Sequence, residues 1–522
     1  MGQHMAKRKV EEGIKLYAAQ NHDKAIEKWE QALRKIRGPH DRFAILGYLA
    51  SAHFDRGKYR EMLTFAIEQI DLANETENDV LKAEAYLNLA RGNNHLCEYQ
   101  KAISYSVHCL ENETNDGRIQ AYAYLNLANA QSGFGNFSKA LKYYHEAMTR
   151  SKAVKDSTLQ LQIYSAMGRL YTALKDYETS LNHFLKAAEL SKSSNSEDVN
   201  SKYQRETCLN FARPYQKLGR YEEAMEACEE GLKKALSCHD RATQAECLCS
   251  FADIHRHRGD FERCYPRYEA ALSLMMEVGN KEGQAVCLLG MAKALVASKN
   301  ITKVCECKAL EINARAVDIA EGIGNKLQIL RCRMHMEELY RTLGDLELVA
   351  EQLSICNDLL EDMGLFCGVC NQVMGDNPDK LGFLPCFHLF HSRCMVHILT
   401  DGSSGGSLDS GGKWPSCPTC ASLPTDLPIS PTAHIPKLTL VKNPKFTKTG
   451  GQMANHVHGN HAAHHNPSDH QHIIKLDHSP CGNHVNIFHR QDDNDASERR
   501  RRTEQHMSLY DNDADNQDIN YL

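Results

Sequence analysis

Small and aromatic residues recur along the first 290 residues at a fixed spacing. One small residue is followed by another twelve positions later, as at Ala128 and Ala140. An aromatic residue such as Tyr144 often stands four positions further on, and a third small residue follows at Ala147. Small residues let two helix backbones approach, and an aromatic side chain fills the gap beside them. The pattern therefore predicts antiparallel helical hairpins.

This pattern returns seven times in phase between residues 11 and 290. Counted from the first small residue, with Ala50 as a weaker second repeat, the steps are 37, 40, 38, 40, 44 and 40 residues. The tetratricopeptide unit is about 34 residues long, so we expect longer helices here. The sequence predicts an all-α fold, a tetratricopeptide-like α-solenoid. Such a solenoid offers an extended concave surface for another protein and no obvious catalytic pocket.

Residues 291–362 continue the helical pattern less regularly. An apolar stripe that includes Leu330, Leu343 and Leu353 predicts helix over residues 326–362. The stripe fits a coiled-coil partner site or a terminal hairpin that caps the solenoid, and Gly344 interrupts any long coiled coil. Both interpretations stay open from the sequence.

Composition and charge narrow the class of protein. The chain has 522 residues with a formal net charge of -6, which suits several domains and gives no reason to expect a nucleic-acid partner. It has no apolar run of about 18 residues and no secretory segment after Met1. We therefore expect a cytoplasmic protein, in which the 20 cysteines are reduced and clustered ones bind metal rather than form disulfides.

A Cys/His cluster follows the helices, over residues 363–423. Its eight candidate ligands are Cys367, Cys370, Cys386, His388, His391, Cys394, Cys417 and Cys420. Zinc takes four thiolate or imidazole ligands, so eight predict two structural Zn²⁺ ions. The spacing allows a sequential or an interleaved pairing. The segment has little apolar material, and we expect its folding energy to come largely from the metal, typically about 10–16 kcal/mol per site.

The two ends of the chain carry weaker signals. Residues 1–10 place Gly2 after the initiator, as N-myristoylation requires, and Lys7 to Lys9 add a basic patch that suits the inner leaflet. Ala6 stands where Ser or Thr is favoured, and a plain Met-Gly start is the alternative. Residues 424–522 are rich in His, Asn and Asp. We expect a disordered polar tail there, with metal binding as the alternative.

The order of these features resembles the rapsyn family of receptor-associated synaptic scaffolds. The resemblance runs over roughly residues 1–421, from Met1-Gly2-Gln3 through the long repeats to Leu384-Pro385-Cys386-x-His388-x-Phe390-His391, a motif similar to a RING-H2 finger. It implies the interleaved pairing. The first site would then hold Cys367, Cys370, His391 and Cys394, and the second Cys386, His388, Cys417 and Cys420.

The resemblance also implies a function. It suggests a membrane-attached scaffold that clusters nicotinic acetylcholine receptors beneath the postsynaptic membrane, self-associates and links them to cytoskeletal proteins. RING modules bind a ubiquitin-conjugating enzyme and contribute no nucleophile, so no catalytic residue is expected. Val369 and Pro418 match the groove that contacts this enzyme, whereas Ala421 stands where many active RINGs carry a basic residue. A RING that only binds proteins, or a chain that is primarily a ubiquitin ligase with a substrate-selecting solenoid, stays open.

Overall fold

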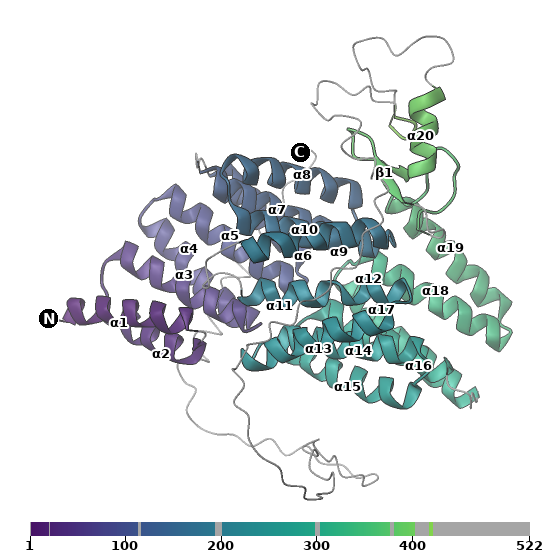
Figure 1. The fold of residues 1–522 in the computed structure, drawn as a ribbon, viewed down its shortest axis with the longest axis horizontal. Helices are drawn as coiled ribbons and strands as arrows, with labels where there is room; N and C mark the ends of the chain where they lie inside the picture. The colour runs from purple at the N-terminus through teal and green to yellow at the C-terminus, as the bar shows by residue number, and fades with distance from the viewer. Residues whose placement is uncertain are drawn as a thin grey trace, which may run out of the picture. The chain divides into compact units, whose positions relative to one another are not determined.

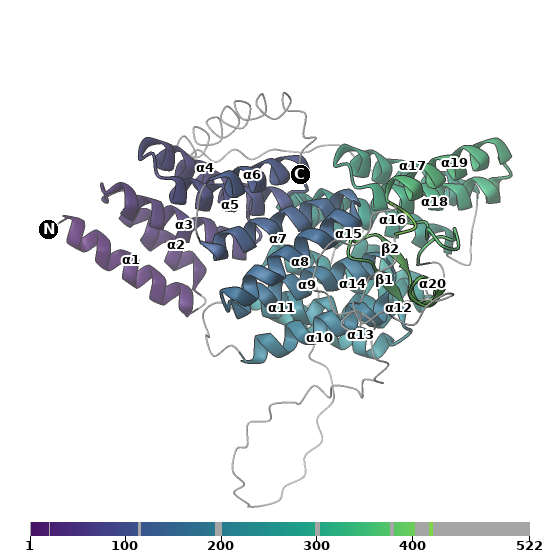
Figure 2. The ribbon, with the colours of Figure 1, turned by 90° about the horizontal axis from the view of Figure 1, so that it is seen from above.

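The fold consists almost entirely of paired helices. The computed structural model describes residues 2–19, 21–112, 116–193, 201–297, 303–375, 380–401 and 417–420, which belong to one compact unit. The glycine-rich run before Cys417 and the predicted tail at 424–522 lie outside these ranges. Nine consecutive helical hairpins form within the described part, and they can be followed from purple to green in Figures 1 and 2. The predicted α-solenoid is confirmed.

The first seven hairpins coincide with the seven repeats of the sequence. Their helices are α1 (Gly2–Ala18) and α2 (His22–Leu33), α3 (Pro39–Asp55) and α4 (Tyr59–Glu75), α5 (Asp79–His95) and α6 (Tyr99–Glu111), α7 (Gly117–Phe134) and α8 (Phe137–Ala153), α9 (Ser157–Ala173) and α10 (Tyr177–Ser193), α11 (Ser201–Asn210) and α12 (Ala212–Lys217) with α13 (Tyr221–Ser237), and α14 (Arg241–His257) and α15 (Phe261–Val278). Most of these helices have 17 residues, which accounts for the long repeat.

Aromatic side chains pack against small residues as the sequence pattern predicts. Trp29, Tyr144, Phe184 and Tyr268 are all buried. A Cβ atom at Gly168 would lie 2.4 Å from the ring of Phe184, so only a glycine lets this ring approach the backbone so closely. The aromatic residues thus close the space between neighbouring helices.

Two further hairpins follow the seventh. The eighth comprises α16 (Lys281–Ala297) and α17 (Lys303–Gly322), and the ninth comprises α18 (Lys326–Leu343) and α19 (Leu346–Asp362). Gly344 has a left-handed φ of 82° and ends α18, while the Asp345 carboxylate caps α19 by accepting a hydrogen bond from the Leu348 N–H. The segment at 326–362 is therefore a hairpin in this structure and not one continuous helix.

The sixth hairpin differs from the others because its first helix is interrupted. Pro214 has no N–H, and its ring crowds the carbonyl four residues earlier, at Asn210. The helix accordingly ends at Asn210 and resumes as α12 at Ala212. The repeat-to-repeat step of 44 residues falls at this hairpin.

The first helices of the hairpins lie on the concave side of the solenoid. Successive first helices, such as α14, α16 and α18, contact one another, whereas second helices approach one another less closely. The stack curves until residues about 185 positions apart meet. Lys281 pairs with Glu98 at 3.0 Å, Tyr99 donates a hydrogen bond to Glu282 at 3.0 Å, and Ala242 lies against Gly57. These contacts form a seam between successive superhelical turns that the repeat pattern did not predict.

A small module follows α19, here called the Cys/His module (residues 365–375, 380–401 and 417–420). It has two antiparallel strands, β1 (Leu381–Phe383) and β2 (Leu389–His391), with Leu381 opposite His391, and one helix, α20 (Ser392–Asp401). The sequence suggested that this segment has little apolar material of its own. That expectation was wrong, because Phe387, Phe390 and Met395 are buried in a core that continues into the fourth and fifth hairpins.

Candidate metal centre and membrane-attachment site

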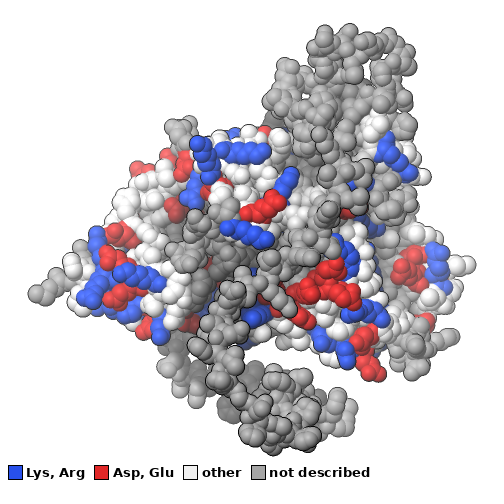
Figure 3. All heavy atoms as spheres, in the orientation of Figure 1, with Lys and Arg blue, Asp and Glu red and all other residues white. Residues whose placement is uncertain are grey.

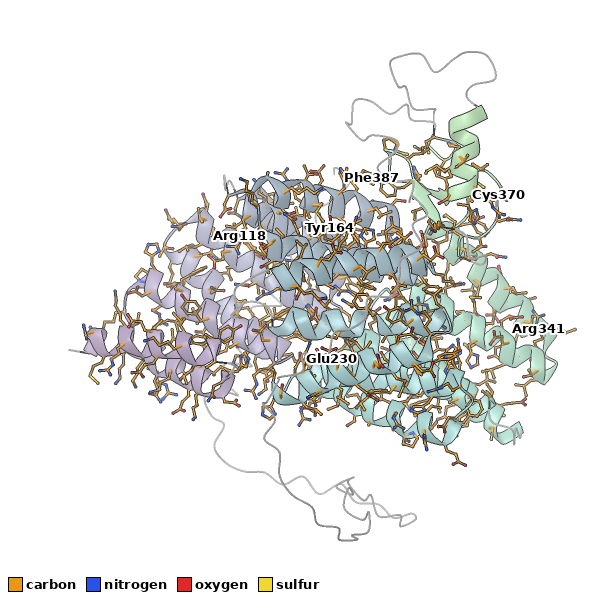
Figure 4. The ribbon with its side chains drawn as sticks, in the orientation of Figure 1. Arg118, Tyr164, Glu230, Arg341, Cys370 and Phe387 are labelled. Atoms are coloured by element: carbon orange, nitrogen blue, oxygen red, sulfur yellow. The ribbon has the colours of Figure 1, made fainter. Side chains whose placement is uncertain are left out.

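The eight predicted ligands gather into two groups. Cys367, Cys370, His391 and Cys394 form one, and Cys386, His388, Cys417 and Cys420 form the other, with the ligand atoms of each group within 4.8 Å of one another. The groups interleave along the chain, which is the pairing that the family resemblance implied. Figure 4 labels Cys370 in the Cys/His module.

The distances within the groups suit a tetrahedral zinc ion. Typical Zn–S and Zn–N bond lengths place a sulfur and a nitrogen ligand roughly 3.5 Å apart. His391 Nδ1 lies 3.4 Å from Cys370 Sγ and 3.9 Å from Cys394 Sγ. His388 Nδ1 lies 3.4 Å from Cys386 Sγ and 3.7 Å from Cys417 Sγ. The donors could therefore hold two zinc ions, each with four protein ligands.

Two tight turns bring the ligands of each Cys-x-x-Cys or Cys-x-His motif together. After Cys367 the chain reverses, with the Asn371 N–H donating to the Cys367 carbonyl at 2.8 Å and Asn371 in the left-handed region. At the second site Phe387 adopts a φ of 64°, which costs a bulky residue free energy. Its ring is buried and stacks on Phe383, so packing holds the unfavourable backbone between Cys386 and His388. Sequence patterns gave no signal for this strain.

Electrostatics within each group also favour a bound cation. Burial alone would raise the pKa of Cys367. The N–H groups of Cys370 and Val369 outweigh burial, and the pKa is lowered to about 6. Burial and the neighbouring thiols raise the pKa of Cys394 to about 12. Burial likewise raises the pKa of Cys386 to about 12. Thiols this close cannot all ionise by themselves, and a divalent cation removes that conflict.

Asp176 fixes the Cys/His module to the solenoid, and sequence reasoning missed this residue. It lies in the turn between α9 and α10, where it caps α10 by accepting a hydrogen bond from the Thr179 N–H. Its second oxygen accepts a hydrogen bond from the Leu381 N–H at 3.0 Å. Beside it Lys380 pairs with Glu178 at 2.9 Å. Burial raises the pKa of Asp176, and the two N–H donors counter that increase in part.

The two residues predicted to contact a ubiquitin-conjugating enzyme are exposed on adjacent turns. The side chain of Val369 is 43% exposed, and Pro418 is exposed as well. The turns meet at Gly368, where a Cβ atom would touch Thr419 and Pro418. Phe387, which Figure 4 labels, packs against His145 of α8, with ring centroids 5.8 Å apart. The solenoid therefore leaves Val369 and Pro418 accessible. Ala421 lies outside the described residues.

The candidate acylation site stands at the start of a helix. Gly2 is the first residue of α1, and the basic patch lies one to two turns later. Lys7 pairs with Asp41 at 3.5 Å and Arg8 with Glu12 at 3.3 Å. The patch is thus partly neutralised, and its attraction to anionic lipid is weaker than that of free cations. No helix in the described ranges is long and apolar enough to cross a bilayer.

Surface charge elsewhere is mixed. Figure 3 shows Lys and Arg interspersed with Asp and Glu over the face that it draws. Many of these charges pair between helices, as Arg118 does with Asp156 at 2.7 Å. Among the described residues of this face, no continuous basic stripe of the kind that marks a nucleic-acid interface is seen.

A solenoid of tetratricopeptide-type hairpins that ends in a Cys/His module defines a protein-binding scaffold. The chain is 38% identical over 422 residues to the 43 kDa receptor-associated protein of the synapse from Tetronarce californica, and 38% identical over 425 residues to that of Gallus gallus. The matched region covers 98% of each relative. It takes up 80% of this chain in the first comparison and 81% in the second. The chain therefore belongs to the rapsyn family, and the predicted resemblance is confirmed.

Family models match in three places. Residues 1–79 match the rapsyn N-terminal myristoylation and linker region, and residues 119–193 and 206–233 match tetratricopeptide repeats. A solved structure of a Rap protein with competence and sporulation factor covers 69% of this chain and 99% of its own, with a TM-score of 0.48 and 14% identity. That likeness is too weak to add to the assignment.

Proposed function

We propose that this protein is a membrane-attached scaffold that binds and clusters nicotinic acetylcholine receptors at the postsynaptic membrane and links them to the cytoskeleton. The main support for this proposal is the 38% sequence identity to two relatives that are named receptor-associated proteins of the synapse, over 98% of their length. The long concave surface supports a binding role, and hairpin stacking offers surfaces for self-association.

Gly2 is proposed to carry a myristoyl group that attaches the protein to the inner leaflet. The match of residues 1–79 to the family's myristoylation region supports this proposal. One myristoyl chain gives only marginal binding, about 10⁴ M⁻¹, and the partly paired basic patch adds little to it. Several anchors in one cluster would then make the attachment firm, because their binding is multivalent.

The test of the scaffold is receptor clustering in cells. The protein is expressed with muscle-type nicotinic receptor subunits in non-muscle cells, and receptor distribution is imaged. We expect clusters with the unchanged chain and diffuse receptors with Gly2→Ala. Gly322→Ala is the matched control, because no atom outside its own helix lies within 4 Å of a Cβ at that position. Receptors that stay diffuse with the unchanged chain, and fail to co-purify with it, would contradict the proposed function.

A second candidate activity is ubiquitin-type ligation by the Cys/His module as a RING-H2 finger. The observation that favours it is the exposure of Val369 and Pro418 on adjacent turns while the module is packed on the solenoid. The module would hold a charged conjugating enzyme near a substrate lysine, and its catalysis would be proximity and orientation. Its two zinc ions would be structural.

Purified protein with ubiquitin, an activating enzyme, ATP and a panel of conjugating enzymes tests this activity. We expect self-modification that Val369→Asp removes and that the matched exposed valine change, Val396→Asp on α20, leaves in place. Zinc content is measured for both variants, so that a loss of activity is not a loss of fold. If no conjugating enzyme gives modification, the module serves binding alone.

A further inference from the structure

The seam between superhelical turns repeats with a step of five hairpins. The turn inside the second hairpin, at Gly57, lies against Ala242 at the start of the seventh. In the turn inside the third hairpin, Glu98 pairs at 3.0 Å with Lys281, which begins the eighth. Each side of the seam therefore has one kind of surface, the turns inside hairpins on one side and the linkers between hairpins on the other.

The same step holds as far as the Cys/His module. The linker before the ninth hairpin meets the turn of the fourth, where a Cβ atom at Gly324 would lie 2.8 Å from the ring of Phe134. The turn of the fifth hairpin holds the module through the hydrogen bond from Leu381 to Asp176. The module therefore stands where a tenth hairpin would begin, and later parts of the chain cover the turns of hairpins two to five.

The turns inside later hairpins are not covered by the described residues. A Cβ atom at Gly219, Gly259 or Gly344, in the turns of the sixth, seventh and ninth hairpins, would meet no atom within 4 Å apart from its chain neighbours. The first linkers of the chain lie open for another reason, because no hairpin stands five places before them. We call residues 218–220, 258–260 and 344–346 the open turn edge, and residues 76–80 and 154–158 the open linker edge.

The open turn edge carries an apolar side chain at a position that the seam buries elsewhere. Three residues before the second helix begins, the third hairpin has Leu96 and the fifth has Leu174, and both are buried. Leu96 packs on the facing linker, since a Cβ atom at Gly279 would lie 3.2 Å from its side chain. In the sixth hairpin the same position is Leu218, whose side chain is 41% exposed.

The open linker edge shows the same difference. Three residues before the first helix begins, the eighth hairpin has Val278 and the ninth has Ile323, which are buried in cores shared with the first four hairpins. In the fifth hairpin this position is Val154, which is 40% exposed. Single exposed apolar residues are common on protein surfaces. Here, however, the exposed residues hold positions equivalent to those that the seam buries on its two sides.

We propose that the seam continues between molecules, with the open turn edge of one copy of this chain docked on the open linker edge of a second copy. The occupant is a second copy because the two kinds of edge already fit each other within the chain. The two surfaces in the contact are different, so each copy keeps one open edge after it binds. Because a superhelix advances along its axis, the assembly grows as an open filament.

This inference deepens the proposed scaffold function, because it assigns the surfaces through which the scaffold self-associates. The contact needs neither the receptor nor acylation of Gly2, so the two proposals can fail separately. A chain that clusters receptors in cells and stays monomeric in solution would overturn this inference alone. A chain that assembles in solution and leaves receptors diffuse would overturn the scaffold function alone.

The test mixes two variants of the full-length protein, each with one edge blocked, and follows assembly by sedimentation velocity. Leu218→Asp blocks the turn edge, and Val154→Asp blocks the linker edge. Assembly would bury each new carboxylate without a partner, so we expect each variant alone to associate at least about tenfold more weakly than the unchanged chain. An equimolar mixture should form dimers and nothing larger, because each variant supplies the edge that the other lacks.

The mixture also controls for folding, since dimers form only if both variants keep an intact edge. Val396→Asp on α20 is the matched control, because this valine is 45% exposed and lies outside both edges. It should assemble as the unchanged chain does, through a series of oligomers that lengthens with concentration.

Four results would overturn the proposal. An unchanged chain that stays monomeric would exclude the contact, and a dimer that does not grow with concentration would mean that the same surface is used by both copies. A mixture that is as monomeric as its two components would place the contact elsewhere. Assembly that appears only after residues 424–522 are removed would make that segment of the chain, and not a second copy, the occupant of the edge.

Discussion

The carboxylate of Asp176 accepts a hydrogen bond at 3.0 Å from the backbone N–H of Leu381, 205 residues further along the chain. Asp176 belongs to the turn between α9 and α10, and Leu381 begins β1 of the Cys/His module. The bond joins the fifth hairpin to a module that comes after the ninth. The module is thus part of the packed structure and is not a domain on a free linker.

Replacing Asp176 by Ala is expected to loosen the module. Two N–H groups, of Thr179 and Leu381, lose their acceptor, at a cost of about 1–3 kcal/mol each when they stay buried. Asp176→Asn is the intermediate control, because its amide oxygen still accepts one of the two bonds while its NH2 group cannot accept the other. It also removes a buried charge, whose cost raises the pKa of Asp176. Hydrogen exchange of residues 381–391 measures the effect, and equal exchange in both variants would contradict this role.

Paired substitutions in the Cys/His module distinguish the two ways of sharing ligands. With the interleaved groups, Cys367→Ser with Cys394→Ser removes one zinc ion of two, and Cys367→Ser with Cys386→Ser removes both. A sequential pairing gives the opposite result. Native mass spectrometry counts the metal. Cys356→Ser, a buried thiol outside both groups, should leave two ions bound. Chelation should also lower the melting temperature, because structural zinc contributes folding energy.

His53 makes the first hairpins sensitive to acid. Burial, together with the charges of Lys58 and Arg56, lowers its pKa from 6.5 to about 4. Between these two values the unfolded chain binds a proton that the folded chain does not. The free energy of unfolding therefore falls as the pH drops through this window, by roughly 2–3 kcal/mol.

His53→Phe should remove that loss and keep the stacking on Phe65, whose ring centroid lies 5.3 Å away. Urea unfolding at pH 7 and pH 4.5 measures the difference. His40→Phe is the control, since His40 is exposed at the start of α3. A variant at His53 that loses as much stability in acid as the unchanged chain would show that other groups dominate.

Gly290→Ala is expected to destabilise the seventh and eighth hairpins. The added Cβ would lie 2.4 Å from the ring of Tyr268, which is fully buried and cannot move aside. Overpacking of this kind costs about 1–3 kcal/mol. Gly322 is the last residue of α17, and a Cβ there would meet no atom outside its own helix, so Gly322→Ala should be neutral or slightly stabilising. Thermal unfolding compares the two, and equal melting temperatures would mean that the structure relaxes around Gly290.

The sequence by itself determined the local construction of this protein. Hairpins such as α9–α10 follow from the periodic small and aromatic residues, because these encode contacts between neighbouring helices. The eight ligands follow from residue type and spacing, and Gly2 from its place after the initiator. Family membership follows from the same motifs in order. Each of these features depends on residues that are close in the chain.

Tertiary structure alone decided what meets over long distances. Small rotations from one repeat to the next accumulate, and their sum determines which residues meet after a full turn. No local pattern fixes that sum. The bond from Leu381 to Asp176 and the seam between Glu98 and Lys281 both depend on it. The ligands could therefore be predicted from the sequence, whereas the contacts between distant repeats could not.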